Sequence, residues 1–308
     1  MKIAVVGSGA VGCYYGALLA KSGQDVTFIA RGENLTRLKT QGIRMKSHFG
    51  DFDLAQVNAT DSPVSVGYVD LILFCVKTYA TEQAAKSMLP LIGPDTVVMP
   101  LQNGNMTELL GEIVGIQHIL GGLTYIFVNR EAPGVINQTS NFHRIIFGEL
   151  NGEKSSRAQA IHNVLEQCGV TAILSDDITR ELWSKLMFIS PIGAVSSIVR
   201  LPVGEYRNVP ETRALLLNAM KEIDMVAKSK GVNFDSNIVA QKMELVDNLN
   251  PQSMTSMQRD IMAGLTSEVE ELVQAINVMG NQNGIPTPTY QFMYSVLKPV
   301  EVRARQPK

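Results

Sequence analysis

The stretch IAVVGSGAVGCYYGALLAKSGQDVTFI, residues 3–29, contains a complete strand–helix–strand pattern. The apolar run at residues 3–6 is typical of a strand buried in a parallel sheet. A helix rich in small residues follows to Ser22, and Gly23 is placed to end it. A second strand is expected at residues 26–29. One such unit within thirty residues predicts a Rossmann-type, doubly wound α/β sheet at the N-terminus.

The turn between the first strand and the helix has the spacing GxGxxG, which is typical of dinucleotide-binding loops in this context. Gly7 allows the tight turn, Gly9 lets the backbone approach a pyrophosphate, and Gly12 lets helix and strand pack closely. The free N–H groups of the helix N-terminus favour phosphates. A glycine-rich turn in a non-binding α/β protein is the alternative. The expected cofactor contacts are Gly7, Ser8, Gly9, Ala10, Val11 and Gly12.

The end of the second strand indicates which nucleotide binds. NAD-binding proteins usually carry Asp or Glu there to hold the ribose 2'-hydroxyl. This chain has Ala30 and then Arg31-Gly32, so a guanidinium stands where a 2'-phosphate would lie. A solvated surface arginine is the alternative. The sequence therefore favours NADPH as the cofactor.

Two further apolar runs, Val69 to Val76 and Thr96 to Leu101, end in polar residues. Ligands of open α/β sheets bind outside the carboxyl ends of the strands, so Lys77, Gln102 and Asn103 are expected to line the same crevice as the glycine loop. A solvated strand end and an Asn-Gly turn are the plain alternatives. From Gly122 to Gly148 the pattern predicts strands that form an antiparallel edge of the same sheet.

A length of 308 residues predicts two domains. The pattern beyond Ser175 is helical, apart from expected loops at Pro202-Val203-Gly204, at Pro251 and at Pro286-Thr287-Pro288. We therefore expect a cofactor-binding Rossmann domain over residues 1–176 and an all-helical substrate and catalytic domain over residues 177–308.

Composition argues against several classes of protein. A net charge of -2 gives no basic surface for nucleic acid. The three cysteines and four histidines lack the spacing of a disulfide framework or a metal site. Residues 3–20 are uncharged but are broken by four glycines, so a membrane span is not expected. We predict a cytoplasmic enzyme without a metal.

A lysine interrupts the apolar stripe of the helix that follows Asp177. Ile178, Leu182, Lys185 and Ile189 share one face at 3.6 residues per turn. A buried lysine needs a partner or a task, and burial lowers its pKa towards the range useful for proton transfer. The alternative is a lysine that reaches solvent and pairs with Glu181.

A carboxylate forms the matching anomaly on a second predicted helix. Glu268 lies near the centre of an apolar face, whereas Glu270 is expected to point to solvent. Opposite charges on two apolar faces suggest a shared site with Lys185, and a structural buried ion pair is the alternative. The face as predicted consists of Met257, Ile261, Leu265, Glu268, Leu272, Ala275 and Met279.

Several blocks together carry a family resemblance. They are the glycine loop with Arg31, Val76-Lys77, Gln102-Asn103-Gly104, Trp183-Ser184-Lys185-Leu186, Ser256-Met257-Gln258-Arg259-Asp260, Ser267-Glu268 and Gly284-Ile285-Pro286-Thr287-Pro288. On these residues the whole chain resembles the ketopantoate reductase (2-dehydropantoate 2-reductase) family.

The resemblance implies that NADPH reduces the ketone of ketopantoate to give pantoate for pantothenate and coenzyme A synthesis. It makes Lys185 the general acid and gives Glu268 the substrate hydroxyl. By the same resemblance Asn103 positions the lysine and the nicotinamide, Ser256 contacts substrate, and Ser253 stands where an asparagine is frequent.

Other positions depart from the family pattern. Typical members have asparagines four and eight residues after the lysine, where this chain has Ile189 and Gly193, and Asn-Gly after the glutamate, where Val273-Gln274 stand. The alternatives are therefore a paralogous reductase of another 2-oxo acid, a related dehydrogenase working oxidatively on a hydroxy or amino acid, and an NADPH-binding regulator without activity. A homodimer is a further expectation.

Overall fold

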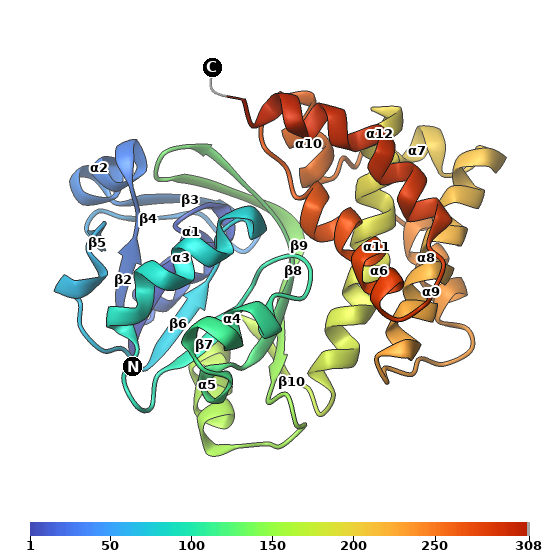
Figure 1. Ribbon diagram of the computed structural model, residues 1–308. Coiled ribbons are helices and arrows are strands. Elements are labelled where there is room, and N and C mark those ends of the chain that lie inside the picture. The colour runs from blue at the N-terminus through green and yellow to red at the C-terminus, as the bar shows by residue number, and fades with distance from the viewer. Residues whose placement is uncertain (307–308) are drawn as a thin grey trace. The chain divides into compact units, whose positions relative to one another are not determined.

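Five parallel strands form the sheet that the first residues of the chain predict. The protein is described by a computed structural model over residues 1–306. The strand order is β5-β2-β1-β6-β7, and the four pairings between neighbours are all parallel (Figure 1). The strands are β1 (Lys2–Val6), β2 (Asp25–Ile29), β5 (Asn58–Thr60), β6 (Leu71–Phe74) and β7 (Val97–Pro100). The predicted Rossmann-type sheet is thus confirmed.

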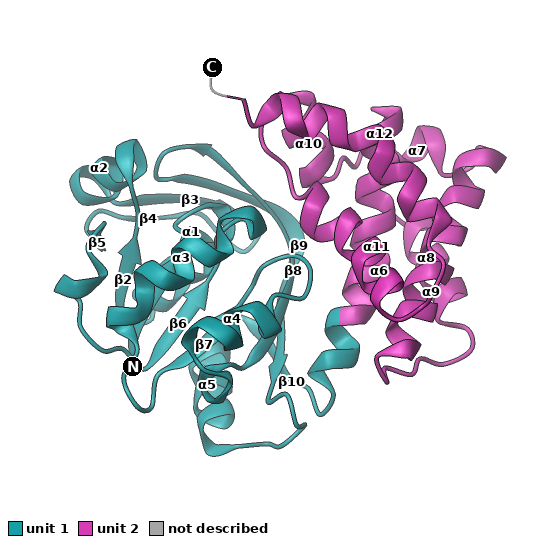
Figure 2. Ribbon diagram, in the orientation of Figure 1, with its two compact units in different colours: residues 1–182 teal, residues 183–308 magenta. Residues whose placement is uncertain are grey.

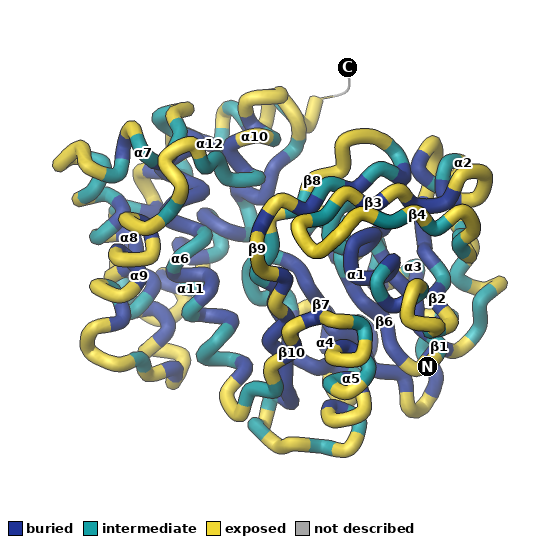
Figure 3. Tube along the Cα trace, turned by 180° about the vertical axis from the view of Figure 1, so that it is seen from behind, coloured by how far each residue is buried: buried dark blue, intermediate teal, exposed yellow. Residues whose placement is uncertain are grey.

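Helices cover both faces of this sheet because its central strands are apolar on both sides. Ile3 and Val5 of β1 share a core with α1, whereas Ala4 and Val6 share another with α3 and α4. Figure 3 shows the resulting buried trace along β1 and β6. These helices, with α2, are α1 (Ala10–Lys21), α2 (Gly32–Gln41), α3 (Thr81–Met88) and α4 (Thr107–Val114).

A second sheet forms around the long strand β9 (Val135–Gly148). Its order is β10-β9-β3-β4, and β8 (Gly121–Ala132) pairs antiparallel with β9. The expected antiparallel pairing is confirmed, but its placement at the edge of the first sheet is wrong. The reason is that β9 pairs with β3 (Ile43–Ser47) and β10 (Thr171–Leu174) as well as with β8. Beyond that, an isolated bridge joins Val98 to Ile119.

The remaining short elements of this part of the chain connect the two sheets. Helix α5 is capped by Ser155, whose side chain accepts a hydrogen bond from the amide of Ala158. The elements are β4 (Phe52–Leu54), α5 (Ser156–Gln167) and the 3-10 helices η1 (Pro63–Ser65), η2 (Thr78–Ala80), η3 (Leu89–Leu91) and η4 (Ile116–His118).

The C-terminal part is helical, as predicted, and has its own apolar core. The expected loop at Pro202-Val203-Gly204 is instead the start of a short helix, because Pro202 has the extended conformation of a residue before a first turn. The helices are α6 (Ile178–Val199), α7 (Val203–Tyr206), α8 (Pro210–Ser229), α9 (Ile238–Asp247), α10 (Ser256–Met262), α11 (Ala275–Gln282) and α12 (Pro288–Ala304).

The predicted continuous helix through Met257 and Met279 is wrong. Helix α10 ends at Met262, Gly264 has φ +66°, and Leu265 is 52% exposed. A π-helical turn, η5 (Glu270–Gln274), then leads into α11. Gly264 takes a left-handed conformation that costs glycine little, so it ends the first helix.

The chain divides into two compact units, residues 1–182 and residues 183–308 (Figure 2). This division falls inside α6, a few residues after the position between residues 176 and 177 that the sequence suggests. Helix α6 is long and apolar enough to span a membrane, but 72% of its most apolar window is buried in the protein. That environment is typical of a core helix. Residues 3–20 form β1 and most of α1.

Candidate functional site

The glycine loop between β1 and α1 has the close approaches that its spacing predicts. Gly7 has φ +97°, and a methyl group there would lie 2.5 Å from the amide nitrogen of Val76. A methyl group at Gly12 would overlap the carbonyl oxygen of Gly7 and lie 2.9 Å from Val5. At Gly9, by contrast, an added methyl group would meet nothing within 4 Å. Open space therefore lies over the one glycine whose backbone is expected to face a pyrophosphate.

Hydrogen bonds to neighbouring segments hold this loop in place. The Ser8 hydroxyl is buried and donates to the carbonyl of Ile29 at 2.9 Å. Asn34 of α2 donates through Nδ2 to the carbonyl of Ser8 at 2.7 Å and accepts at Oδ1 from the amide of Gly134. Asn34 was not predicted, although a buried amide near the N-terminus of a helix is a usual anchor for a loop.

The predicted polar residues follow neighbouring strands of the first sheet. β1 lies between β2 and β6, and the chain leaves it towards opposite sides, so the glycine loop sits at a topological switch point. Arg31 is exposed and stands directly before α2, two residues after β2 ends. Lys77 follows β6, and Asn103 follows β7. Because the strands are parallel, these residues share the carboxyl edge of the sheet.

Gln102 braces that edge through its buried side chain. Its Nε2 donates to the carbonyl of Val76 at 3.0 Å and to the hydroxyl of Thr81 at 2.8 Å. Its Oε1 is buried and has no hydrogen-bond partner among the described residues. An unpaired buried acceptor is uncommon in folded proteins, and a ligand donor is one group that would satisfy it.

Lys185 is buried on α6 in the second unit. Its residue is 6% exposed, so the burial that the apolar stripe predicts is confirmed. Burial lowers the pKa of the lysine from 10.5 to about 8, and the negative charge of Glu268 acts in the opposite direction. An amine with such a pKa can exchange a proton near neutral pH.

Glu268 is 2% exposed and directly precedes the helical segment that contains η5. The residue before it is fixed by α12, since Glu301 accepts hydrogen bonds from both the amide and the hydroxyl of Ser267. Glu301 was missed, although Met293, Leu297 and Glu301 share the apolar phase that identified Lys185.

Glu270 differs from its prediction. It accepts hydrogen bonds from Lys298 at 2.5 Å and from the hydroxyl of Tyr294 at 3.0 Å, and it is half-buried rather than directed to solvent. The π-helical turn changes the helical phase on which its outward direction was based.

The two predicted serine contacts lie at the start of α10. Ser256 is the first residue of that helix, and the preceding Thr255 accepts the amide of Gln258 at 3.1 Å. Ser253 is half-buried, and its carbonyl accepts a hydrogen bond from the amide of Val203. The second unit thus contains Lys185, Glu268 and both serines, while the predicted cofactor residues lie in the first unit.

Comparison with known proteins identifies the family. The model of the family Ketopantoate reductase PanE/ApbA matches residues 3–152, and that of its C-terminal domain matches residues 177–301. The chain belongs to the ketopantoate reductase family. Like the 2-dehydropantoate 2-reductases, it is an oxidoreductase.

Relatives in this family match almost the whole chain. An uncharacterized oxidoreductase of Bacillus subtilis, YkpB, is 28% identical over 98% of this chain and 99% of its own length. The 2-dehydropantoate 2-reductase of Nostoc is 29% identical over 99% of this chain and 96% of its own length.

Solved structures show the same fold. The 2-dehydropantoate 2-reductase of Geobacter metallireducens has a TM-score of 0.91 at 29% identity, covering 97% of this chain and 99% of its own. A D-mandelate dehydrogenase solved with NADH and anilino(oxo)acetate has a TM-score of 0.92 over the whole of both chains. At 23% identity the latter likeness concerns the fold alone.

Against the pattern of other ketopantoate reductases, the face of α6 beyond Lys185 is apolar. Ile189 is half-buried, and a methyl group at Gly193 would lie 3.0 Å from Cε of Met257. The methionine methyl therefore occupies the space next to Gly193, where family members have an asparagine. Ser190 does not replace the missing amide, because its hydroxyl is buried and donates to the carbonyl of Leu272.

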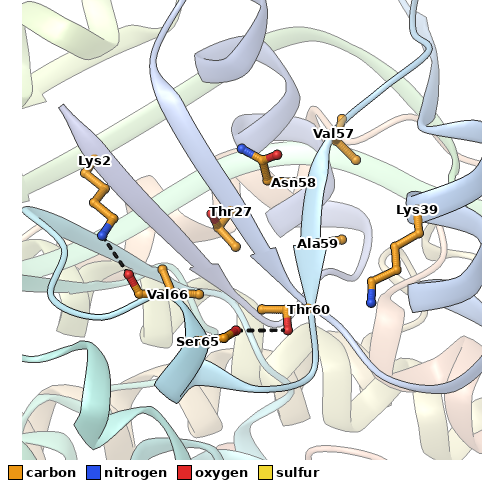
Figure 4. A pocket seen from close by; sticks show the side chains of 9 residues that line it. All are labelled: Lys2, Thr27, Lys39, Val57, Asn58, Ala59, Thr60, Ser65 and Val66. Atoms are coloured by element: carbon orange, nitrogen blue, oxygen red, sulfur yellow. Dashed lines mark hydrogen bonds between the residues drawn. The ribbon is translucent and has the colours of Figure 1, made fainter.

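A cavity of about 450 Å³ lies elsewhere in the first unit (Figure 4). Lys2, Thr27 and Asn58 are among its lining residues, and none of the predicted site residues lines it. Lys2 donates to the carbonyl of Val66 there at 2.7 Å. The family's chemistry is therefore not assigned to this cavity.

Proposed function

We propose that this protein reduces the ketone of a branched 2-oxo acid with NADPH, in the cytoplasm, and that ketopantoate, which yields pantoate for pantothenate synthesis, is the first substrate to test. The observation that carries the proposal is the buried Lys185, whose pKa of about 8 and neighbouring Glu268 suit proton donation to a forming alkoxide. The family and the 2-dehydropantoate 2-reductases among its relatives support the substrate class.

The first unit has the features that a nicotinamide dinucleotide requires. Gly9 precedes a helix of twelve residues, and open space lies over it for a pyrophosphate. Arg31 offers a guanidinium to a 2'-phosphate, which favours NADPH over NADH. Bound nicotinamide supplies a hydride to the carbonyl carbon. Lys77, Gln102 and Asn103 would line the same edge of the sheet.

The second unit supplies the proton. When the carbonyl π bond breaks, its oxygen takes a proton from the Lys185 ammonium, and the neutral amine regains one from solvent. Glu268 stabilises the ammonium form and offers a carboxylate to a substrate hydroxyl. Ser253 and Ser256 have hydroxyls that can bind the substrate carboxylate.

A second candidate substrate follows from a specific observation. Ile189 and the Met257 methyl next to Gly193 replace the amides of other family members, and Ser190 is engaged elsewhere. An apolar surface at these positions suits a 2-oxo acid with an apolar branch and gives no bond to the 4-hydroxyl of ketopantoate.

The decisive measurement is the loss of NADPH absorbance with ketopantoate and with a panel of branched 2-oxo acids. Reduction of at least one of them, abolished in Lys185→Ala, is expected. Absence of turnover with every acid, while NADPH binds, would favour a regulator. Turnover only of hydroxy or amino acids with NADP⁺ would favour an oxidative enzyme.

A further inference from the structure

Ser190 lies at the centre of a directed chain of hydrogen bonds in the core of the helical unit. The residue is 0% exposed, and its Oγ donates to the carbonyl oxygen of Leu272 at 2.5 Å. The hydroxyl of Tyr290 lies 2.7 Å from the same Oγ. A serine hydroxyl has one proton, and a carbonyl oxygen can only accept. The Tyr290 hydroxyl must therefore donate to Ser190, and Ser190 donates to Leu272.

The acceptor of this chain lies in the π-helical turn η5. Turns of this kind are rare, are less regular than α-helix and occur frequently at functional sites. The Leu272 amide donates to the carbonyl of Glu268 at 2.9 Å, so the peptide groups on both sides of Leu272 are bonded. One bond leads back to Glu268, and the other leads across to α6.

Two links therefore join α6 to the segment that contains Glu268. The first is electrostatic and joins Lys185 to Glu268, and the second is the bond from Ser190 to Leu272. Five residues separate the two positions on α6, a rise of about 7.5 Å in an α-helix. Four residues separate them on the other segment, and a π turn adds one residue per turn. The position of Glu268 relative to Lys185 thus depends on this turn being kept.

We infer that Ser190 is a positioning residue, whose hydroxyl holds the π-helical turn after Glu268 and thereby sets the placement of that carboxylate relative to Lys185. This inference rests on the proposed function for its catalytic consequence. Its structural content is independent, because the charge environment of Lys185 can be measured without substrate.

The far end of the chain provides a matched control. Tyr290 is also 0% exposed, and its backbone amide is held separately by Glu222 at the start of α12. Tyr290→Phe removes the outer hydroxyl but leaves Ser190 free to donate to Leu272. Ser190→Ala removes both bonds. Both variants lose a buried hydroxyl, but only the second releases the π-helical turn.

The first readout is the pKa of Lys185, followed by NMR of lysine labelled with ¹³C at Cε, with the resonance assigned by its loss in Lys185→Arg. Burial lowers this pKa and Glu268 raises it. A displaced carboxylate therefore shifts it further down, by about half a unit or more in Ser190→Ala. Ser190→Cys, with a weaker donor of similar size, should shift it less in the same direction. Tyr290→Phe should leave it within about 0.2 unit.

The second readout is the pH profile of kcat/KM for the best 2-oxo acid. Its alkaline limb should move to lower pH in Ser190→Ala, and kcat should fall more than KM rises. Ser190→Thr, which keeps the donor, should restore the limb. Equal shifts in Tyr290→Phe and Ser190→Ala, or an unchanged Lys185 pKa in both Ser190→Ala and Ser190→Cys, would overturn the inference. Should Ser190→Ala not fold, Ser190→Cys and Tyr290→Phe decide it by the same criteria. A shifted pKa in an enzyme that reduces no 2-oxo acid would support the inference and count against the proposed function.

Discussion

Lys185 and Glu268 are both buried in the helical unit, and they act on each other through opposite charges. Burial lowers the pKa of Lys185 to about 8, and the carboxylate of Glu268 limits that fall. A lysine without the carboxylate would lose its proton at lower pH, and a lysine without burial would hold it too tightly to transfer it near neutrality. The pair therefore fits a general acid whose proton affinity is tuned by two opposing effects.

The pH dependence of ketone reduction follows from that pKa. Lys185 is protonated below it and neutral above it, so kcat/KM for reduction should fall as the pH rises through about 8. Glu268→Gln removes the effect that raises the pKa, so the midpoint should move to lower pH. An initial-rate profile from pH 5 to 10, roughly centred on the expected acid limb, measures both. A profile that is flat in the wild-type protein would assign the proton to another group.

Lys185→Ala should lose about 10² to 10⁴ in turnover, the usual contribution of a positioned general acid. NADPH affinity should stay unchanged, because the predicted cofactor residues lie in the first unit. Stopped-flow turnover together with a fluorescence titration of NADPH separates the two effects. Retention of more than half the turnover would exclude the role.

Arg31→Ala should weaken NADPH binding selectively. A charge-assisted bond to the 2'-phosphate contributes roughly 1.5–3 kcal/mol, or about 10- to 100-fold in Kd. NADH lacks that phosphate and should bind almost as before. Arg31 is exposed directly before α2, so its loss should not unfold the protein. Equal weakening of both cofactors would show that the arginine supports the loop instead of the phosphate.

Two glycines of the loop should respond differently to a methyl group. Gly12→Ala overlaps the carbonyl of Gly7 and should lower the free energy of unfolding by about 1–3 kcal/mol. Gly9→Ala meets no protein atom and has φ -81°, so the fold should keep its stability. Its methyl group would instead stand in the space expected for the pyrophosphate and weaken NADPH about tenfold or more. Thermal unfolding and cofactor titration of both variants make the comparison. Normal NADPH affinity in Gly9→Ala would place the pyrophosphate elsewhere.

Local patterns predicted the elements whose signals are local. The strand, turn and helix of residues 3–29 are β1, α1 and β2 in the structure, since apolar runs and glycines act within a few residues. The sheet that contains β8 and β9 could not be assigned in this way. Its neighbour β3 lies about ninety residues earlier in the chain, and the pairing of distant strands leaves little trace in either one.

The helical unit shows the same limit at smaller scale. The burial of Lys185 and Glu268 was predictable from helical phase, because a charge on an apolar stripe is conspicuous. The break at Gly264 and the π-helical turn were not predicted, although the glycine was a usable signal for the break. Ser190 and Tyr290 gave no signal, since single small or aromatic residues on an apolar helix indicate packing rather than a directed hydrogen-bond chain.

Substrate preference is the prediction that tests the departures from the family. The positions four and eight residues after Lys185 are Ile189 and Gly193, and the Met257 methyl lies beside the second. A buried amide that bonds a substrate hydroxyl discriminates strongly against an analogue without it, whereas an apolar side chain discriminates poorly. The ratio of kcat/KM for ketopantoate to that for its analogue without the 4-hydroxyl should therefore be small, within about tenfold. Gly193→Asn with Ile189→Asn should raise the ratio if the double variant folds, and Met257→Ala would give the new amide room. A wild-type ratio above about 10³ would show instead that Gln274 or another donor recognises the hydroxyl, and that the apolar face of α6 lies away from that end of the substrate.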